Sequence, residues 1–327
     1  MARAEFPAPF RGLVGRVVAF WRAHWRRLLV VASAGVGLLE WGLQLHFSRA
    51  APAPSEWVAL RPTVQQWIQP GTLIVVAPPW AEPNARLAFG DELMPLGHVA
   101  RADDTSFESA LEISILGQHP SELVGWRLES ELDTGRFLLR RWTNPQPARV
   151  LYDFLAQAEP PRLSVSVQNG DAREECTYGK AKVSNGDLHG HPTFPSRRYS
   201  CPGAEWLFVG PTVIEDQNYR PRSCLWAHPP AHGTLVLRFD AVPIAATIRG
   251  YAGLPFFYER DKQGSPVDLA VWVGGEAVGH YRHSDGEGWK PFEISTARFA
   301  GQVQSVEFRV ESERAWQREF CFQAEVR

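Results

Sequence analysis

The chain has 327 residues, with 34 basic and 36 acidic side chains and a formal net charge of −2. Residues 1–27 carry six arginines against one acidic residue, a net charge of +5, which leaves −7 for the rest of the chain. Nucleic-acid binding requires a basic face, so this acidic body excludes nucleic acid as a partner. The length allows one large domain or two ordinary domains.

The first fifty residues predict an export and anchoring segment. The six arginines precede an apolar run from Leu28 to about Phe47, and Leu28–Leu39 carries no charge. A membrane-spanning helix needs about 20 mostly apolar residues, and an arginine-rich flank stays in the cytoplasm. We therefore expect a basic cytoplasmic tail over residues 1–27 and a transmembrane signal-anchor over residues 28–49. The bulk of the chain is then periplasmic or extracellular, at the cell envelope.

Two other interpretations of this segment stay open. Ala50–Ala53 offers small residues for a signal-peptide cleavage site. The apolar run could also be the buried helix of a soluble protein. In a spanning helix, Glu40 would be a contact for a partner helix, because an ionisable residue inside a bilayer is costly unless it is paired.

A tether over residues 50–55 leads into a small α/β domain over residues 56–160. Thr72–Ala77 is a continuous apolar run of strand length, as in a strand that is buried on both faces. The other expected elements are a helix at Val64–Ile68, a loop at Pro78–Asp91, strands at Leu111–Leu116 and Phe137–Trp142, and an amphipathic helix at Ala148–Ala156.

Residues 161–327 predict an antiparallel β-sandwich, jelly-roll-like, with no helix. Short strand patterns alternate with turn signals at intervals of about 8–12 residues, which is typical of a sandwich. Gly274-Gly275 between two alternating runs predicts a tight hairpin. The fold class is therefore α+β. The expected strands are Leu163–Val167, Leu207–Val209, Thr212–Glu215, Ser223–Ala227, Thr234–Phe239, Ala245–Tyr251, Val267–Val273, Glu276–Arg282, Lys290–Ile294, Val303–Val310 and Glu319–Val326.

Four cysteines follow the predicted anchor, and an even number in an exported segment favours two disulfides. Of the three connectivities we favour Cys176–Cys201, which brackets one loop-rich segment, together with Cys224–Cys321. Zinc is the competing interpretation, but the chain has no Cys-x-x-Cys pair to supply the usual ligand spacing.

The C-terminal region, about Gly203–Arg327, resembles a jelly-roll of the carbohydrate-binding or galactose-binding-like kind. The resemblance lies in the strand series, in Arg249–Leu254 and in Asp285–Phe292, where a polar loop precedes a Trp-containing strand. It implies a sugar-binding module.

Residues 57–80 resemble an element in the soluble regions of membrane glycosyltransferases of the protein-mannosyltransferase type. Both have a Trp, a helix and a Pro-Gly pair, although Thr72 stands where that family has Asp. The multi-spanning catalytic part is missing. The resemblance implies a role beside a lipid-linked sugar transferase and carries over no catalytic residue.

A first candidate ligand surface lies on the loops of the sandwich. Sugar binding needs flat aromatic faces for the apolar side of the ring and polar groups for its hydroxyls. The alternative is that the aromatic side chains fill the core and that Asp285–Gly288 is only a turn. The candidates are Trp289, Tyr281, Tyr251, Phe256 and Phe257, with Asp285, Glu287, His283 and Arg249.

A second candidate is the segment that follows the buried strand, because α/β sheets place ligands at the carboxyl ends of their strands. Trp80 and Arg86 are the candidate ligand residues there, with Asp91 and His98 nearby. The alternative is a proline-stiffened connection. The chain carries no nucleophile elbow, P-loop or dinucleotide fingerprint, and we assign no catalytic residue.

Metal binding is a minor alternative. His189-Gly190-His191 could bind a metal, and Asp285–Glu287 could hold calcium through carboxylate oxygens. We expect no cofactor.

The sequence therefore predicts a membrane-anchored binding protein of the cell envelope that takes a glycan or a partner. An accessory role in envelope glycan assembly is one form of this hypothesis. One alternative is an enzyme acting on envelope or lipid-linked sugars, with its site in the Pro78–Asp91 segment or on the sandwich rim. The other is a structural subunit of a membrane complex.

Overall fold

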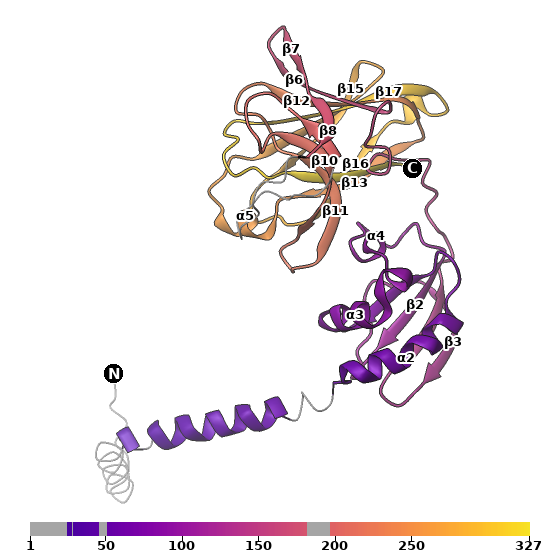
Figure 1. The fold of residues 1–327 in the computed structure, drawn as a ribbon, viewed down its shortest axis with the longest axis vertical. Helices are drawn as coiled ribbons and strands as arrows, with labels where there is room; N and C mark the ends of the chain where they lie inside the picture. The colour runs from indigo at the N-terminus through magenta and orange to yellow at the C-terminus, as the bar shows by residue number, and fades with distance from the viewer. Residues whose placement is uncertain (1–24, 28, 46–50, 182–196) are drawn as a thin grey trace, which may run out of the picture.

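The computed structural model describes residues 25–27, 29–45, 51–181 and 197–327. Their fold is α+β: an N-terminal helix, a small α/β domain and a larger β-sandwich follow one another along the chain (Figure 1). The predicted histidine pair at His189–His191 lies outside the described residues.

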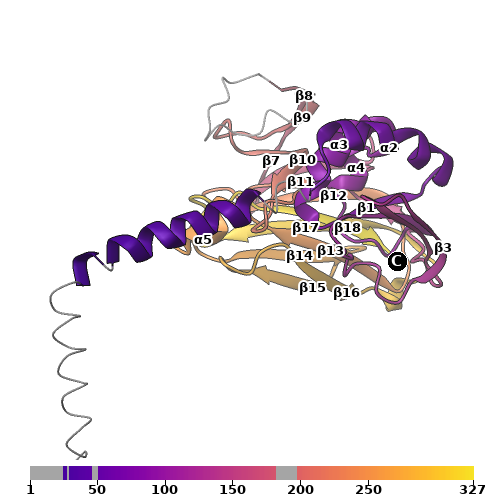
Figure 2. The same cartoon turned by 90° about the horizontal axis from the view of Figure 1, so that it is seen from below.

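The N-terminal helix, Trp25–Leu45, is long and apolar enough to cross a membrane. It spans 21 residues, and none of its apolar window is buried against the rest of the protein. Figures 1 and 2 both show it projecting away from the two domains. The helix therefore adds nothing to either hydrophobic core.

The α/β domain is built on a four-stranded sheet in the order β1-β2-β4-β3. Strands β1 and β2 are parallel, and the other neighbours are antiparallel. Its elements are α2 (Pro54–Trp67), β1 (Leu73–Ala77), η1 (Pro79–Ala81), α3 (Glu82–Leu93), α4 (Leu96–Val99), β2 (Ser109–Ser114), β3 (Arg127–Asp133) and β4 (Leu138–Thr143).

Alternating side chains of this sheet form two apolar layers, because successive residues of a strand point to opposite faces. Ile74 and Val76 of β1 pack under α2 and α3 with Trp57 and Phe89. On the other face Leu73 and its neighbours pack against the segments around Phe107, Leu123 and Trp126. Burial on both faces is what the continuous apolar run of β1 predicted.

Several sequence-based expectations in this domain are wrong. Residues 78–91 are a short 3-10 helix followed by α3, not a loop. Prolines stand in the first turn of each, where the missing N–H costs nothing, so they start these helices rather than stiffen a connection. Strand β3 was not predicted, because its side chains are mostly exposed and polar.

Residues 148–156 do not form the expected helix. Instead the backbone N–H groups of Leu151 and Phe154 donate to the carbonyls of Val326 and Ala324, at 2.8 and 3.1 Å. Strand β5 (Tyr152–Asp153) pairs with the last strand, so the chain enters the sandwich before residue 161. Phe154 is buried and packs edge-on against two phenylalanines of the sandwich core. Tertiary packing has overridden the amphipathic pattern.

The sandwich consists of two sheets that face each other across one core. One sheet has the order β16-β13-β18-β11-β10-β9-β8, with β5 paired to β18, and the other has the order β15-β14-β17-β12-β6-β7. Its strands are β6 (Leu163–Asn169), β7 (Ala172–Glu175), β8 (Thr177–Lys180), β9 (Arg197–Ser200), β10 (Phe208–Glu215), β11 (Pro221–Ala227), β12 (Thr234–Pro243), β13 (Thr247–Gly253), β14 (Val267–Val273), β15 (Glu276–His283), β16 (Lys290–Ser295), β17 (Val303–Ser312) and β18 (Cys321–Val326).

Local signals of the sequence are confirmed at several points in the sandwich. Gly274 and Gly275 join β14 to β15 with φ angles of 60° and 86°, a region that glycine adopts without steric cost. Both favoured disulfides, Cys176–Cys201 and Cys224–Cys321, are present. A short helix, α5 (Phe256–Asp261), was not expected. It is too short to show helical periodicity.

Candidate functional site

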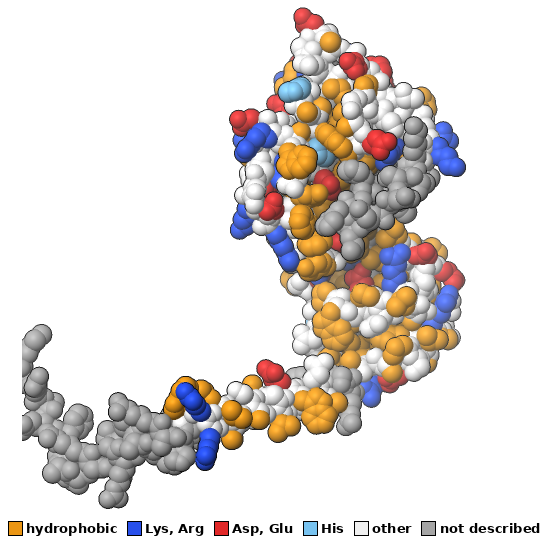
Figure 3. Space-filling model, turned by 60° about the vertical axis from the view of Figure 1, so that its left-hand side comes forward, with side chains coloured by type: hydrophobic (Ala, Val, Ile, Leu, Met, Phe, Trp, Pro, Cys, Tyr) orange, Lys and Arg blue, Asp and Glu red, His pale blue; other side chains and the backbone are white. Residues whose placement is uncertain are grey.

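A cavity of about 970 Å³ lies between the α/β domain and the sandwich. One wall is the carboxyl end of β1 with η1 and the start of α3, and the other is the turn between β10 and β11. The segment 101–105 and the loop 122–126 complete the lining. In Figure 3 hydrophobic side chains gather at the waist between the two bodies. We call this cavity the interdomain cleft.

Aromatic side chains from both domains line the cleft. Trp80 in η1 and Tyr219 in the β10–β11 turn are each 57% exposed, and Trp126 is partly buried. Large exposed aromatics are costly to leave in water, and their flat faces suit the apolar side of a sugar ring. The predicted residues Trp80 and Arg86 both lie in the cleft lining.

Ion pairs fix most charged groups of the cleft. Arg220 binds Glu122 at 3.0 Å and so joins the sandwich to the α/β domain. Arg222 binds Asp216 at 2.8 Å, and Arg101 is paired with Asp104. The remaining guanidinium, that of Arg86, reaches the exposed Asp91 at 2.8 Å. The cleft therefore holds guanidinium donors and carboxylate acceptors in fixed positions. Both kinds of group can form hydrogen bonds with the hydroxyls of a neutral polar ligand.

Glu82 differs from the other carboxylates of the cleft. It is the first residue of α3, it is partly buried, and within the described residues its carboxylate makes no hydrogen bond or ion pair. Burial raises its pKa above the ordinary value, Arg101, Arg220 and Arg222 oppose this, and Glu122 adds to it. Glu82 therefore holds a proton at a higher pH than an ordinary glutamate.

Glu122 has the opposite environment. Burial disfavours its charge, but its own backbone N–H and the side chain of Arg220 outweigh that and hold the pKa below the ordinary value. The cleft thus contains Glu82, whose pKa is raised, and Glu122, whose pKa is lowered.

The two domains are tied together beside the cleft. The N–H of Ser223 donates to the carbonyl of Ala100 at 2.7 Å, and Arg222 donates to the carbonyl of Arg101 at 3.0 Å. Asp103 accepts from Arg327 at 3.3 Å. Burial disfavours the charge of Asp103, but Thr105 and Arg327 together hold its pKa below the ordinary value.

Two predicted sandwich residues belong to this junction rather than to a free rim. The Tyr251 hydroxyl donates to Asp103 at 3.3 Å, and Arg249 lies 3.8 Å from the same carboxylate. Both line a smaller cavity of about 280 Å³, which shares Arg101, Ala102 and Asp103 with the interdomain cleft. Burial, followed by the charge of Asp103, raises the pKa of the Tyr251 phenol.

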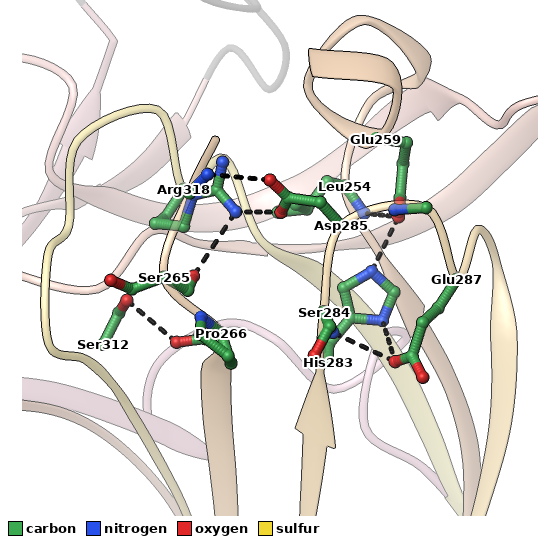
Figure 4. A network of polar contacts seen from close by, with 12 residues as sticks. Leu254, Glu259, Ser265, Pro266, His283, Ser284, Asp285, Glu287, Ser312 and Arg318 are labelled. Carbon is green, nitrogen blue, oxygen red and sulfur yellow. Dashed lines mark hydrogen bonds and ion pairs between the residues drawn. The ribbon is translucent and has the colours of Figure 1, made fainter. Parts of the chain in front are cut away.

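His283 and the predicted loop carboxylates Asp285 and Glu287 belong to a polar network in which His283 is buried and Glu287 is exposed (Figure 4). His283 is fully buried, and its Nε2 lies 2.6 Å from Glu259 of α5. Asp285 is paired with the buried Arg318 and accepts from the N–H of Gly264 at 2.9 Å. Glu287 binds Lys290 at 2.8 Å. These contacts hold α5 and the loop 284–288 in place.

The expected calcium ligands therefore turn to different partners, one to Arg318 and the other to Lys290. Within the described residues no cluster of three or more His, Cys, Asp or Glu side chains could hold a metal ion.

The predicted aromatic residues of the sandwich mostly pack inward. Trp289 stacks on Tyr251 with ring centroids 6.4 Å apart and lies against the cluster around the Cys224–Cys321 disulfide. Tyr281 is partly buried, and its hydroxyl lies 3.0 Å from Nδ1 of His283. Burial raises its pKa. The structure thus brings Trp289 together with Tyr251, and Tyr281 together with His283.

The remaining candidates are Phe256 and Phe257, which are adjacent in α5, and His98 in the α/β domain. Phe256 contacts Tyr219 of the cleft at a centroid distance of 4.9 Å, and Phe257 is about half exposed. His98 packs edge-on against Phe107. Burial, followed by the charge of Arg101, lowers the pKa of this imidazole.

Sequence reasoning missed the sandwich side of the cleft. Tyr219 and Arg220 come from the turn between β10 and β11, and Arg222 comes from the start of β11. A segment that combines one tyrosine with two arginines is an available signal, but only the fold shows that it faces η1. Glu122 and Arg101 carried no local motif at all.

No family model and no curated protein matches the chain. Among solved structures it is similar to CBM51 from Clostridium perfringens GH95 in complex with methyl-galactose, with a TM-score of 0.26, 11% identity and coverage of 36% of this chain and 81% of that one. It is also similar to the tandem CBM51 modules of Sp3GH98 from Streptococcus pneumoniae, with a TM-score of 0.29, 11% identity and coverage of 70% and 74%.

A third similar structure is that of the CBM51-2 and INT domains of Clostridium perfringens ZmpB, with a TM-score of 0.28, 8% identity and coverage of 62% of this chain. The chain spans only 41% of that structure's length. These neighbours include carbohydrate-binding modules, the class that the C-terminal sequence resembles. At such TM-scores the likeness is partial, and the ligands named for those proteins say nothing about this one. The mannosyltransferase resemblance of residues 57–80 stays a prediction.

Proposed function

We propose that this chain is a membrane-anchored, extracytoplasmic protein that binds a glycan in the interdomain cleft. The observation that carries the proposal is the cleft itself: about 970 Å³, lined by Trp80, Trp126 and Tyr219 together with ion-paired arginines and carboxylates. Ligand sites are typically clefts of about 300–1,000 Å³ at domain interfaces, with apolar walls and a few placed polar groups. The volume suits a short oligosaccharide.

The composition of the lining favours a sugar over other ligands. Exposed aromatic faces from both domains supply apolar contacts, and charge-assisted donors and acceptors supply strong hydrogen bonds to hydroxyls. The arginines Arg86, Arg101, Arg220 and Arg222 are all engaged by carboxylates, so the cleft has no excess of positive charge for a polyanion.

The N-terminal helix supports anchoring at the membrane. Its 21 residues reach about 32 Å at 1.5 Å per residue, which matches a hydrocarbon core of about 30 Å. Arg26 and Arg27 lie at its start, so the positive-inside rule places this end in the cytoplasm. The two disulfides fit an oxidising compartment for the domains that follow. Resistance to alkaline extraction from membranes would test the anchoring.

Glycan binding is tested with the full chain in detergent micelles. A glycan array identifies the oligosaccharides that the protein retains, and isothermal titration calorimetry measures their Kd. We expect Trp80→Ala to weaken binding about 5- to 30-fold, since the loss of one buried aromatic contact is worth roughly 1–2 kcal/mol.

The matched control is Trp316→Ala, because Trp316 is 80% exposed and lies outside the cleft lining. If Trp80→Ala leaves the Kd unchanged, the glycan does not bind in the cleft. A folded protein that retains no glycan on the array would end the proposal.

A further inference from the structure

The interdomain cleft holds two glutamates in contrasting surroundings. Glu82 projects from the start of α3, and Glu122 comes from the loop between β2 and β3. Glu122 is held by Arg220 at 3.0 Å, whereas Glu82 makes no hydrogen bond or ion pair within the described residues. A partly buried carboxyl group without a partner, in a cavity of this size, is free to meet a ligand.

The charges around Glu82 come from every wall of the cleft. Arg101 lies on the segment after α4, Arg220 on the β10–β11 turn, Arg222 at the start of β11, and Glu122 on the loop between β2 and β3. Arg86, one turn further along α3, is engaged by Asp91. Three of these groups favour the charged form of Glu82, but burial outweighs them and raises its pKa. Glu122 stays ionised, because Arg220 and its own backbone N–H favour the carboxylate.

We propose that the interdomain cleft hydrolyses a glycosidic bond, with Glu82 as the proton donor and Glu122 as the carboxylate that stabilises positive charge on the sugar. This inference rests on the proposed function, because the glycan must first bind in the cleft. Two carboxyl groups, one neutral and one charged, are the recurring means of cleaving glycosides. Trp80 and Tyr219 would position the sugar ring between them.

The reaction balances without any further reagent. Glu82, in its protonated form, gives its proton to the glycosidic oxygen as the bond from that oxygen to the anomeric carbon breaks. The ionised Glu122 stabilises the positive charge that develops on the sugar. Water then adds to the anomeric carbon, and its proton returns to the Glu82 carboxylate. One glycoside and one water become two hydroxyl compounds, and both glutamates end in their starting states.

The test uses the full chain in detergent micelles and the array oligosaccharides that it retains. Mass spectrometry follows their cleavage into fragments that have gained one water, and calorimetry follows binding. We expect cleavage by the unmodified protein and a loss of about 100-fold or more in Glu82→Gln, while the Kd changes by less than about 3-fold. The rate should fall as pH rises through the elevated pKa of Glu82, and this dependence should vanish in Glu82→Gln.

The matched control is Glu92→Gln, on the same helix but exposed and paired with Arg61 outside the cleft. It should cleave at the normal rate. Binding without cleavage by the unmodified protein would overturn this inference and leave the proposed function standing. Equal cleavage by Glu82→Gln would also overturn it. Absence of binding would end both.

Discussion

Replacing Glu319 by glutamine should stabilise the sandwich at neutral pH. Glu319 lies just before β18 and accepts a hydrogen bond from the Tyr258 hydroxyl of α5 at 2.9 Å. Burial raises its pKa to about 6, only partly opposed by that hydrogen bond, from an ordinary value of 4.5. Glutamine keeps an oxygen that accepts from Tyr258 and removes the charge that burial disfavours.

The magnitude and its sign follow from the two pKa values. Below pH 4.5 the group is neutral in the folded and unfolded chains and has no effect. Between about 4.5 and 6 the unfolded chain releases its proton first, so stability falls as pH rises. Above 6 the penalty is complete and amounts to about 2 kcal/mol, at 1.36 kcal/mol for each pH unit of difference.

Thermal unfolding of the full chain in micelles, at pH 7.5 and pH 4.0, measures the effect. At pH 7.5 we expect Glu319→Gln to raise Tm by about 4–8 °C, since about 1 kcal/mol shifts a domain of this size by 2–4 °C. At pH 4.0 the two proteins should unfold together. The control Glu313→Gln, exposed in the same loop, should change neither value. A gain of equal size at both pH values would refute the reasoning, and so would a loss at pH 7.5.

Three further substitutions probe the sandwich by thermal or denaturant unfolding. Cys224→Ala with Cys321→Ala should cost about 4–5 kcal/mol, more than loss of the other disulfide, because it opens a loop of 97 residues rather than 25. Gly250→Ala should cost at least about 1–3 kcal/mol, since its Cβ would lie 2.1 Å from a carbonyl oxygen of β18, whereas Gly179→Ala meets nothing within 4 Å and should be tolerated. Trp289→Ala should destabilise by about 3 kcal/mol, because this side chain packs on the disulfide cluster; equal stability would mean that the ring is a surface platform after all.

The strands of the sandwich were predictable because each carries its own local signal. The run Val267–Val273 alternates buried and partly exposed residues along its whole length and coincides with β14. Gly274-Gly275 fixes the turn that follows. In such a segment the alternation, the turn and the tertiary burial all agree, so a single sequence is enough.

Elements whose local pattern conflicts with their packing were not predictable. Residues 148–156 have the spacing of an amphipathic helix, but Phe154 gains more by filling the sandwich core, and the backbone pairs with β18 instead. The polar strand β3 has almost no buried face to produce an alternation. Both outcomes depend on partners that lie far away in the sequence.

Only part of the candidate site was predictable, because the rest depends on contacts between residues that lie far apart in the sequence. Trp80 and Arg86 follow a buried parallel strand, and that position alone marks them as cleft residues. Arg220 and Glu122 meet at 3.0 Å across 98 positions of the chain. Their pairing follows from how the two domains dock, which no local pattern encodes. Conversely, His283 and Asp285 are residue types that can bind a sugar, but His283 contacts Glu259 of α5 and Asp285 is paired with Arg318.

The order of the disulfides along the chain bears on how the protein can mature. The first cysteine pairs with the second, and the third with the fourth. In a chain that emerges amino-terminus first into an oxidising compartment, each bridge can form as soon as its second thiol arrives. Oxidation of neighbours in order of appearance then gives the native pairing directly. Maturation should therefore need a thiol oxidant but no isomerase to reshuffle wrong bridges.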